Sequence, residues 1–271
     1  MAGKRQGGTP TQRWTMQHRP VSGERRADSS YFEVSKRPLQ VLVFLIPFLF
    51  LYESGTQFYL SHAATGTVDT IRAHSILLGF FQDFGAFGRF LPCVALVAVL
   101  LIWHILNGDR WSVNPFVIPA MLMESIALTL PLLVLVILIQ MMGGGPPAPA
   151  FAPQGLPDLS PRGLITISIG AGLYEELLFR MVGIAFLHVI FVDLAKMSEK
   201  WGTGLAILLS AAAFAVYHDV TTPSGELEVA KAISLLVAGA YFGIVYVQRG
   251  FGIVVAVHAL YDIIVLVLLR R

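Results

Sequence analysis

The sequence has little of what a disulfide-bonded or soluble protein needs. It contains a single cysteine, Cys93, which excludes an internal disulfide and a cysteine-based metal cage. Only 13% of the residues are charged, against about 25% in soluble globular domains. The net charge of +2 is too small to indicate a nucleic-acid partner. The composition therefore excludes an ordinary soluble domain and argues against nucleic-acid binding.

What the sequence has instead is long, continuous apolar runs. Hydrophobic residues make up 55% of the chain, and the mean hydropathy is +0.70. Several runs reach the ~20 residues that a helix needs to cross a hydrocarbon core about 30 Å thick. The apolar residues do not alternate with polar ones, so the runs indicate helices rather than barrel strands. The sequence therefore predicts an all-α, polytopic membrane helix bundle with the lipid bilayer as a partner.

Hydropathy divides the chain into three parts. Residues 1–37 are polar and basic and are expected to form a disordered cytoplasmic tail. Residues 38–160 hold the N-terminal transmembrane helices and loops, including an amphipathic helix expected over 66–86, and residues 161–271 hold the C-terminal helices. Eight crossings are expected, over 38–59, 88–106, 115–141, 162–180, 182–195, 203–219, 229–248 and 251–269.

Eight crossings would place both termini on one side of the membrane. Of the 19 Lys and Arg residues, 13 then lie on that side, which favours cytoplasmic termini. Lys196 and Lys200 fall on the opposite side and count against this arrangement. An alternative with seven crossings, in which 182–195 is partly re-entrant, stays open.

Three ionisable residues interrupt the apolar segment AGLYEELLFRM. Each charge at the bilayer centre costs about 2.5–3.5 kcal/mol on insertion scales, so Glu175, Glu176 and Arg180 need partners or a water-filled cavity. Glu176 and Arg180 are four residues apart, share a helix face and can neutralise each other as a brace. Glu175 points away from them and is the candidate reactive carboxylate. The alternative is a helix end at the interface, with all three side chains reaching water.

Two further polar sites lie in apolar helices. In LLSAAAFAVYHDV, His218 follows an apolar run that includes Phe214; a histidine at such a helix end can also be a cap or an interfacial residue. In GIVVAVHALYDIIVLVLLRR, His258 lies inside the helix, with Asp262 four residues on and on the same face. This pair can hydrogen-bond or face a common cavity, and the alternative is a purely structural bond between helices.

Taken together, these sites place carboxylates and histidines on three helices of one bundle. Hydrolysis by an activated water requires a base, a second polar group to hold the water, and donors for the developing oxyanion. The combination therefore predicts a hydrolytic site.

The three motifs resemble those of the CPBP (ABI) family. EELLFR fits EExxxR, FAVYH fits FxxxH and HALYD fits HxxxN/D, in the family's order and approximate spacing. The family consists of intramembrane endopeptidases and includes the CAAX prenyl protease of the Ras-converting type and the bacteriocin-processing or self-immunity proteins of bacteria. The resemblance covers about 162–270 and implies that 161–271 is the catalytic core.

The resemblance implies a role for each matching residue. Glu175 and His218 would activate the attacking water, and His258 and Asp262 would stabilise the oxyanion or orient the substrate carbonyl. Many members have Asn at the last position, whose amide can donate a hydrogen bond. An ionised Asp262 cannot donate, so it would have to be protonated or instead orient His258. Three further residues would support these groups: Glu176, Arg180 and Phe214.

Zn²⁺ is the cofactor that the resemblance raises, because the family is often described as metalloprotease. Its ligands would be Glu175, His218 and His258. The sequence has no HExxH motif, and the resemblance equally supports a glutamate-activated water without a metal. The metal-free scheme is the expectation.

The expected function is an intramembrane endopeptidase that cuts a membrane-associated protein or peptide, of the CAAX type or signal-like. One alternative is a non-catalytic membrane protein such as a bacteriocin immunity factor. Another is an ion or proton transporter, since ionisable residues inside membranes often mark a conduction path. The sequence shows no internal repeat or pair of interrupted helices, which disfavours a transporter.

Overall fold

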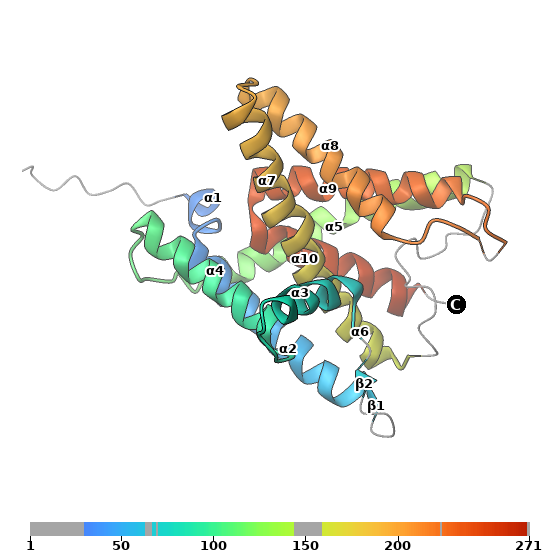
Figure 1. Ribbon diagram of the computed structural model, residues 1–271, viewed down its shortest axis with the longest axis horizontal. Coiled ribbons are helices and arrows are strands. Elements are labelled where there is room, and N and C mark those ends of the chain that lie inside the picture. The colour runs from blue at the N-terminus through green and yellow to red at the C-terminus, as the bar shows by residue number, and fades with distance from the viewer. Residues whose placement is uncertain (1–29, 63–66, 69, 144–158, 223, 270–271) are drawn as a thin grey trace, which may run out of the picture. The chain divides into compact units, whose positions relative to one another are not determined.

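The computed structural model describes residues 30–62, 67–68, 70–143, 159–222 and 224–269, which are mostly helical (Figure 1). A two-stranded antiparallel hairpin pairs β1 (Ser61–His62) with β2 (Thr67–Val68). The α-helices are α1 (Tyr31–Val34), α2 (Pro38–Tyr59), α3 (Arg72–Asp83), α4 (Leu91–Asn107), α5 (Val117–Met142), α6 (Pro161–Gly170), α7 (Ala185–His188), α8 (Glu199–Tyr217), α9 (Val229–Arg249) and α10 (Phe251–Ile263). Four π-helical stretches join or extend them: η1 (Ala171–Glu175), η2 (Leu177–Ile184), η3 (Val189–Leu194) and η4 (Ile264–Leu268).

The all-α, multi-pass fold class is confirmed. In the described part of the chain, six helical segments are long and apolar enough to cross a membrane, and the shorter apolar helix Leu91–Asn107 adds a seventh candidate. The resulting total of seven candidate crossings agrees with the lower of the two expected numbers, eight and seven. An odd number of crossings would put the termini on opposite sides, so their shared cytoplasmic location stays a prediction.

One pair of expected helices is corrected. The sequence predicted separate crossings at 162–180 and 182–195, whereas the structure has one continuous helical segment, Pro161–Leu194, of 34 residues. No proline interrupts this stretch, and Gly183 alone does not end a helix. Within this segment the helix departs from α-helical geometry at three π-helical stretches, η1, η2 and η3, and continues through each of them. Such turns are frequent at functional sites.

The predicted N-terminal tail falls largely on residues 1–29, which lie outside the described residues. Its end is helical, because Tyr31–Val34 forms α1. The amphipathic helix expected over 66–86 is present as the shorter α3, Arg72–Asp83. The chain contacts join Tyr31–Arg271 into one compact unit. The expected division into the N-terminal helices of 38–160 and a catalytic core over 161–271 stays a prediction.

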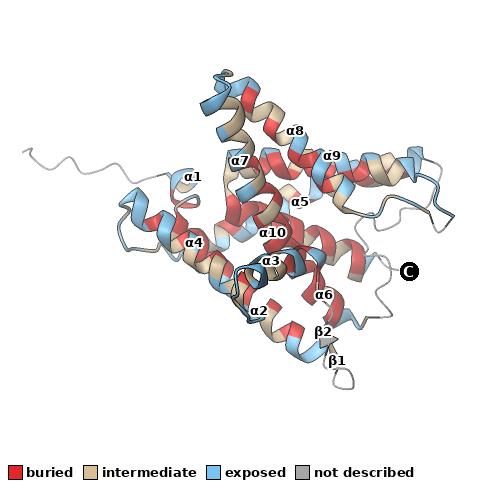
Figure 2. Cartoon of the chain, in the orientation of Figure 1, coloured by how far each residue is buried: buried red, intermediate tan, exposed pale blue. Residues whose placement is uncertain are grey.

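Helix α10 lies at the centre of this unit (Figure 2). All nine residues from Phe251 to Ala259 are buried, and the helix packs against α5, α6 and α9. A helix that is apolar on every side, as this one is, belongs in such a core. Its polar residues His258 and Asp262 are consequently held away from the protein surface.

Gly172 sets the distance between η1 and α10. A Cβ atom at this position would lie 2.6 Å from the carbonyl oxygen of Val255 and 3.0 Å from the backbone nitrogen of Ala259. Only a residue without a side chain allows this approach. The two acidic residues that follow Gly172 are therefore brought next to the histidine of α10.

Candidate active site

The three charged residues of the η1–η2 segment are buried in the protein. The side chains of Glu176 and Arg180 are fully inaccessible, and residue Glu175 is 5% exposed. This burial excludes the alternative in which all three reach water at an interface. Each charge must therefore be balanced inside the protein.

Arg180 balances Glu176. Its guanidinium NH1 atom lies 3.2 Å from Oε1 of Glu176, which is the pairing expected from the spacing of four residues. Its NH2 atom donates a 3.1 Å hydrogen bond to the carbonyl oxygen of Gly239 in α9. The rings of Phe214 and Phe242 lie 4.4 Å and 5.3 Å from the guanidinium carbon and provide cation–π contacts. Arg180 is thus held on several sides.

His258 is fixed by Glu176 and by an aromatic ring. Its Nδ1 atom lies 2.7 Å from Oε1 of Glu176, and its ring stacks on Phe242 with centroids 4.5 Å apart. An ionised carboxylate only accepts hydrogen bonds, so Nδ1 carries a hydrogen. The other ring nitrogen, Nε2, is then aimed at Asp262 Oδ2, at 3.5 Å, and at Glu175 Oε2, at 3.9 Å.

His218 is held by the end of its own helix. Helix α8 ends at Tyr217, and His218 has an extended backbone (φ −85°, ψ 150°) that lets its ring turn back. Its Nδ1 atom is 2.8 Å from the carbonyl oxygen of Phe214. A carbonyl only accepts, so Nδ1 is the donor and Nε2 of the neutral ring is an acceptor. Burial lowers the pKa of His218 to about 4, which keeps the ring neutral near pH 7.

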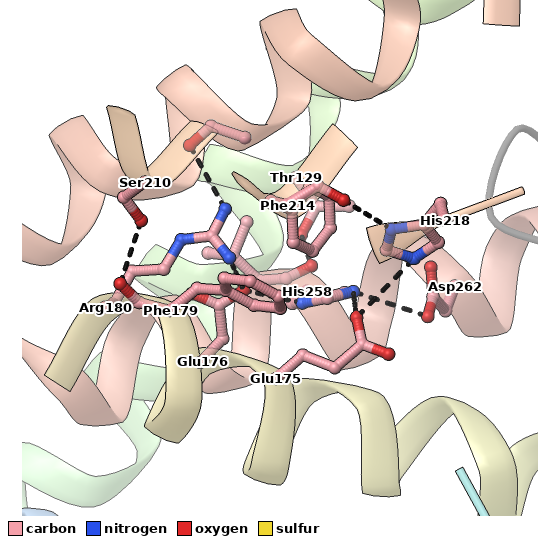
Figure 3. Close-up of polar contacts among 12 residues, drawn as sticks. Thr129, Glu175, Glu176, Phe179, Arg180, Ser210, Phe214, His218, His258 and Asp262 are labelled. Atoms are coloured by element: carbon pink, nitrogen blue, oxygen red, sulfur yellow. Dashed lines mark hydrogen bonds and ion pairs between the residues drawn. The ribbon is translucent and has the colours of Figure 1, made fainter. Parts of the chain in front are cut away.

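Glu175 lies where the two imidazoles converge, as Figure 3 shows. Its Oε2 atom is 3.7 Å from Nε2 of His218 and 3.9 Å from Nε2 of His258. These separations are too long for direct hydrogen bonds and are of the kind that a water molecule bridges. The carboxylate and the neutral His218 ring both accept, so a water between them can donate to each.

Asp262 lies on the far side of His258 from Glu176. It is 3% exposed, and no described residue hydrogen-bonds its Oδ1 atom. Its Oδ2 atom faces His258, so the geometry suits orientation of the imidazole. Its part in the chemistry stays a prediction.

All seven residues singled out from the sequence lie in one cluster drawn from α8, α10 and the η1–η2 segment (Figure 3). They are Glu175, Glu176, Arg180, Phe214, His218, His258 and Asp262. Phe214 is fully buried, and its ring centroid lies 4.5 Å from that of His218 and 5.9 Å from that of His258. It forms the wall between the two imidazoles.

Two features were missed from the sequence. The bond between Glu176 and His258 joins residues 82 positions apart, and no spacing rule predicts it. The only local signal was Gly172, because a glycine inside a helix can indicate a close contact with another helix. It does not indicate which helix. The second feature is the pair of adjacent carboxylates facing one helix, which the π-turn at Ala171–Glu175 permits because it winds more widely than an α-helix.

A metal site is not apparent in this cluster. Among the described residues, no group of three or more His, Cys, Asp or Glu side chains has an arrangement that could hold a metal ion. Zn²⁺ as a cofactor, with Glu175, His218 and His258 as its ligands, stays a prediction, and the chemistry below is derived from the side chains of this protein alone.

Fold and site together define a class: a multi-pass helical membrane protein with a buried carboxylate–imidazole cluster. Residues 158–264 match the family model described as type II CAAX prenyl endopeptidase Rce1-like. The family resemblance is thereby confirmed for this segment, which contains the whole cluster, and it supports intramembrane peptidase activity. Comparisons with curated proteins and with solved structures found no match.

Proposed function

We propose that this protein is an intramembrane endopeptidase in which Glu175 and His218 activate a water molecule. The observation that carries the proposal is the position of Glu175 Oε2, within 3.7 Å and 3.9 Å of ring nitrogens from two other helices, in a buried site. A base, a second acceptor for the water and a wall that excludes bulk solvent are what peptide hydrolysis requires.

The reaction follows from the hydrogen-bonding roles. Glu175 takes a proton from the water while His218 accepts the second O–H, and the water oxygen attacks the substrate carbonyl carbon. The tetrahedral intermediate then collapses, the C–N bond breaks, and the proton on Glu175 passes to the leaving amine. With Nδ1 already bearing a hydrogen, His258 can donate from Nε2 only as the doubly protonated imidazolium, and in that form its Nε2–H would face the developing oxyanion. Glu176 and Asp262 hold that ring in place from its two sides.

The substrate is a protein or peptide associated with the membrane, because the site is enclosed by membrane-spanning helices. The matching family acts on CAAX prenyl proteins by its description, and a prenylated C-terminus is the first substrate to test. A signal-like peptide is the second.

Substrate trapping tests the proposal. Glu175→Gln removes the base and keeps the shape of the side chain, so this variant should retain bound substrate that mass spectrometry can identify. Glu175→Ala, His218→Ala and His258→Ala should each abolish cleavage while the protein accumulates and inserts normally. Glu199→Gln, on the exposed first turn of α8, is the matched control and should cleave like the wild type.

The same preparation separates the other candidate functions. Wild-type cleavage after removal of metals with 1,10-phenanthroline is expected, and its loss with recovery on adding Zn²⁺ would establish a metal enzyme instead. Proton flux in proteoliposomes without any peptidase activity would identify a transporter. Normal cleavage by the triple alanine variant would refute the assignment of these residues.

A further inference from the structure

The cluster is rich in acceptors and poor in donors. Glu175 and the Nε2 atom of His218 accept, and Arg180 is turned away toward Glu176 and Gly239. Stabilising a developing oxyanion requires hydrogen-bond donors fixed in advance. Apart from the ring of His258, the groups described so far supply no such donor.

Tyr217 supplies a neutral donor at this place. Its ring packs edge-on against that of His218, with centroids 5.0 Å apart, and its hydroxyl is close enough to the carboxylate of Glu175 to be affected by its charge. The hydroxyl oxygen is buried, and it reaches no described group at normal hydrogen-bond length. A buried hydroxyl without a hydrogen-bond partner destabilises the fold. A substrate oxygen that accepts from it would recover that free energy.

The ring of Tyr217 is fixed from several directions. Arg72 of α3 donates a 2.8 Å hydrogen bond from NH1 to the Tyr217 carbonyl oxygen, and its guanidinium carbon lies 5.1 Å from the centre of the Tyr217 ring. The rings of Phe179 and His218 pack edge-on, at 5.2 Å and 5.0 Å. A donor held in this way loses little entropy when it binds, which is the condition for strong stabilisation of a transition state.

We infer that Tyr217 is a further catalytic residue, whose hydroxyl donates a hydrogen bond to the carbonyl oxygen of the scissile peptide as it becomes an oxyanion. This inference rests on the proposed peptidase function. It assigns the donor role to a group on α8, next in sequence to the histidine that holds the water.

Steady-state cleavage by Tyr217→Phe tests the inference, because this change removes the hydroxyl and keeps both the ring and the carbonyl that Arg72 binds. A lost oxyanion donor lowers kcat about 10²-fold and leaves KM unchanged. The pH profile of kcat/KM should keep its shape. Tyr241→Phe is the matched control: it removes a hydroxyl that donates to the Leu128 carbonyl at 2.6 Å, away from the cluster, and should keep the wild-type kcat.

Three outcomes would overturn the inference. The first is a wild-type kcat in Tyr217→Phe, and the second is a rise in KM with kcat unchanged. The third is a shift of the pH profile with the maximal kcat retained, which would mean that the hydroxyl only positions Glu175. Glu175→Gln is assayed in parallel: if it is inactive while Tyr217→Phe is fully active, only this inference fails. If the wild type itself cleaves nothing, the proposed function fails and the inference with it.

Discussion

The Nδ1 atom of His258 and the guanidinium of Arg180 meet at the same oxygen, Oε1 of Glu176, at 2.7 Å and 3.2 Å. Two adjacent carboxylates therefore have different surroundings. Glu176 is committed to a cation and an imidazole, whereas the nearest imidazole nitrogens lie 3.7 Å and 3.9 Å from Glu175. This division separates a residue that holds the site together from one that can exchange a proton.

Glu175→Gln and Glu176→Gln should consequently differ in stability. Glu176→Gln leaves Arg180 without its carboxylate and should lower the free energy of unfolding by about 3–5 kcal/mol, as expected for one partner lost from a buried pair. Glu175→Gln breaks no short contact, so it should abolish cleavage and leave the unfolding midpoint near that of the wild type. Thermal unfolding in detergent measures both, and equal losses of stability would contradict the division.

A double-mutant cycle tests the buried ion pair itself. Arg180→Met should destabilise strongly, because Glu176 is then a buried charge without its guanidinium. Adding Glu176→Gln removes that charge, so the double variant should lose less stability than the sum of the two single losses, by about 1–3 kcal/mol. Strict additivity would show that the two side chains do not interact in the membrane-embedded protein.

Gly172→Ala should disrupt the contact between η1 and α10. The added Cβ would meet backbone atoms of Val255 and Ala259, which cannot rotate away as a side chain can. We expect lower thermal stability and at least a tenfold loss of cleavage, since a displacement of about 1 Å can cost 10²-fold in rate. Gly204→Ala is the control, because a Cβ at that position meets nothing within 4 Å. A neutral Gly172→Ala would show that the helices can separate without cost.

The state of His218 predicts a pH dependence. Burial lowers the pKa of this imidazole from 6.5 to about 4, so between these values the unfolded chain binds a proton that the folded chain does not. Stability should therefore fall as the pH is lowered from about 6.5 to 4, with a contribution on the order of 3 kcal/mol. Cleavage should also be lost toward pH 4, because the protonated ring cannot accept from the water.

Unfolding midpoints measured across this range check the prediction, with His218→Asn as the comparison. The variant lacks the titrating group, so its midpoint should vary less with pH. An identical slope in the two proteins would assign the pH dependence to other groups.

The long apolar helices were predictable because lipid leaves the chain few choices. The expected crossings at 38–59, 115–141, 229–248 and 251–269 correspond to α2, α5, α9 and the α10–η4 segment, with ends that differ by up to two residues. A run of about 20 apolar residues must satisfy its own backbone hydrogen bonds, and a helix does so. The prediction of two separate helices within 162–195 was wrong. Composition indicates that this segment is apolar and helical, but it does not show that one helix continues through several π-helical turns.

The sequence alone determined which ionisable residues lie inside apolar segments and are therefore expected to carry the chemistry. Charges are too costly in an apolar segment to be incidental, and their spacing within each helix predicted the Glu176–Arg180 and His258–Asp262 neighbours. Tertiary structure decided how the helices combine: that Glu176 binds His258, that Glu175 faces His218, and that Tyr217 lies beside Glu175. These contacts join residues on different helices, and they depend on the distance and rotation at which the helices pack, which no periodicity along one segment encodes.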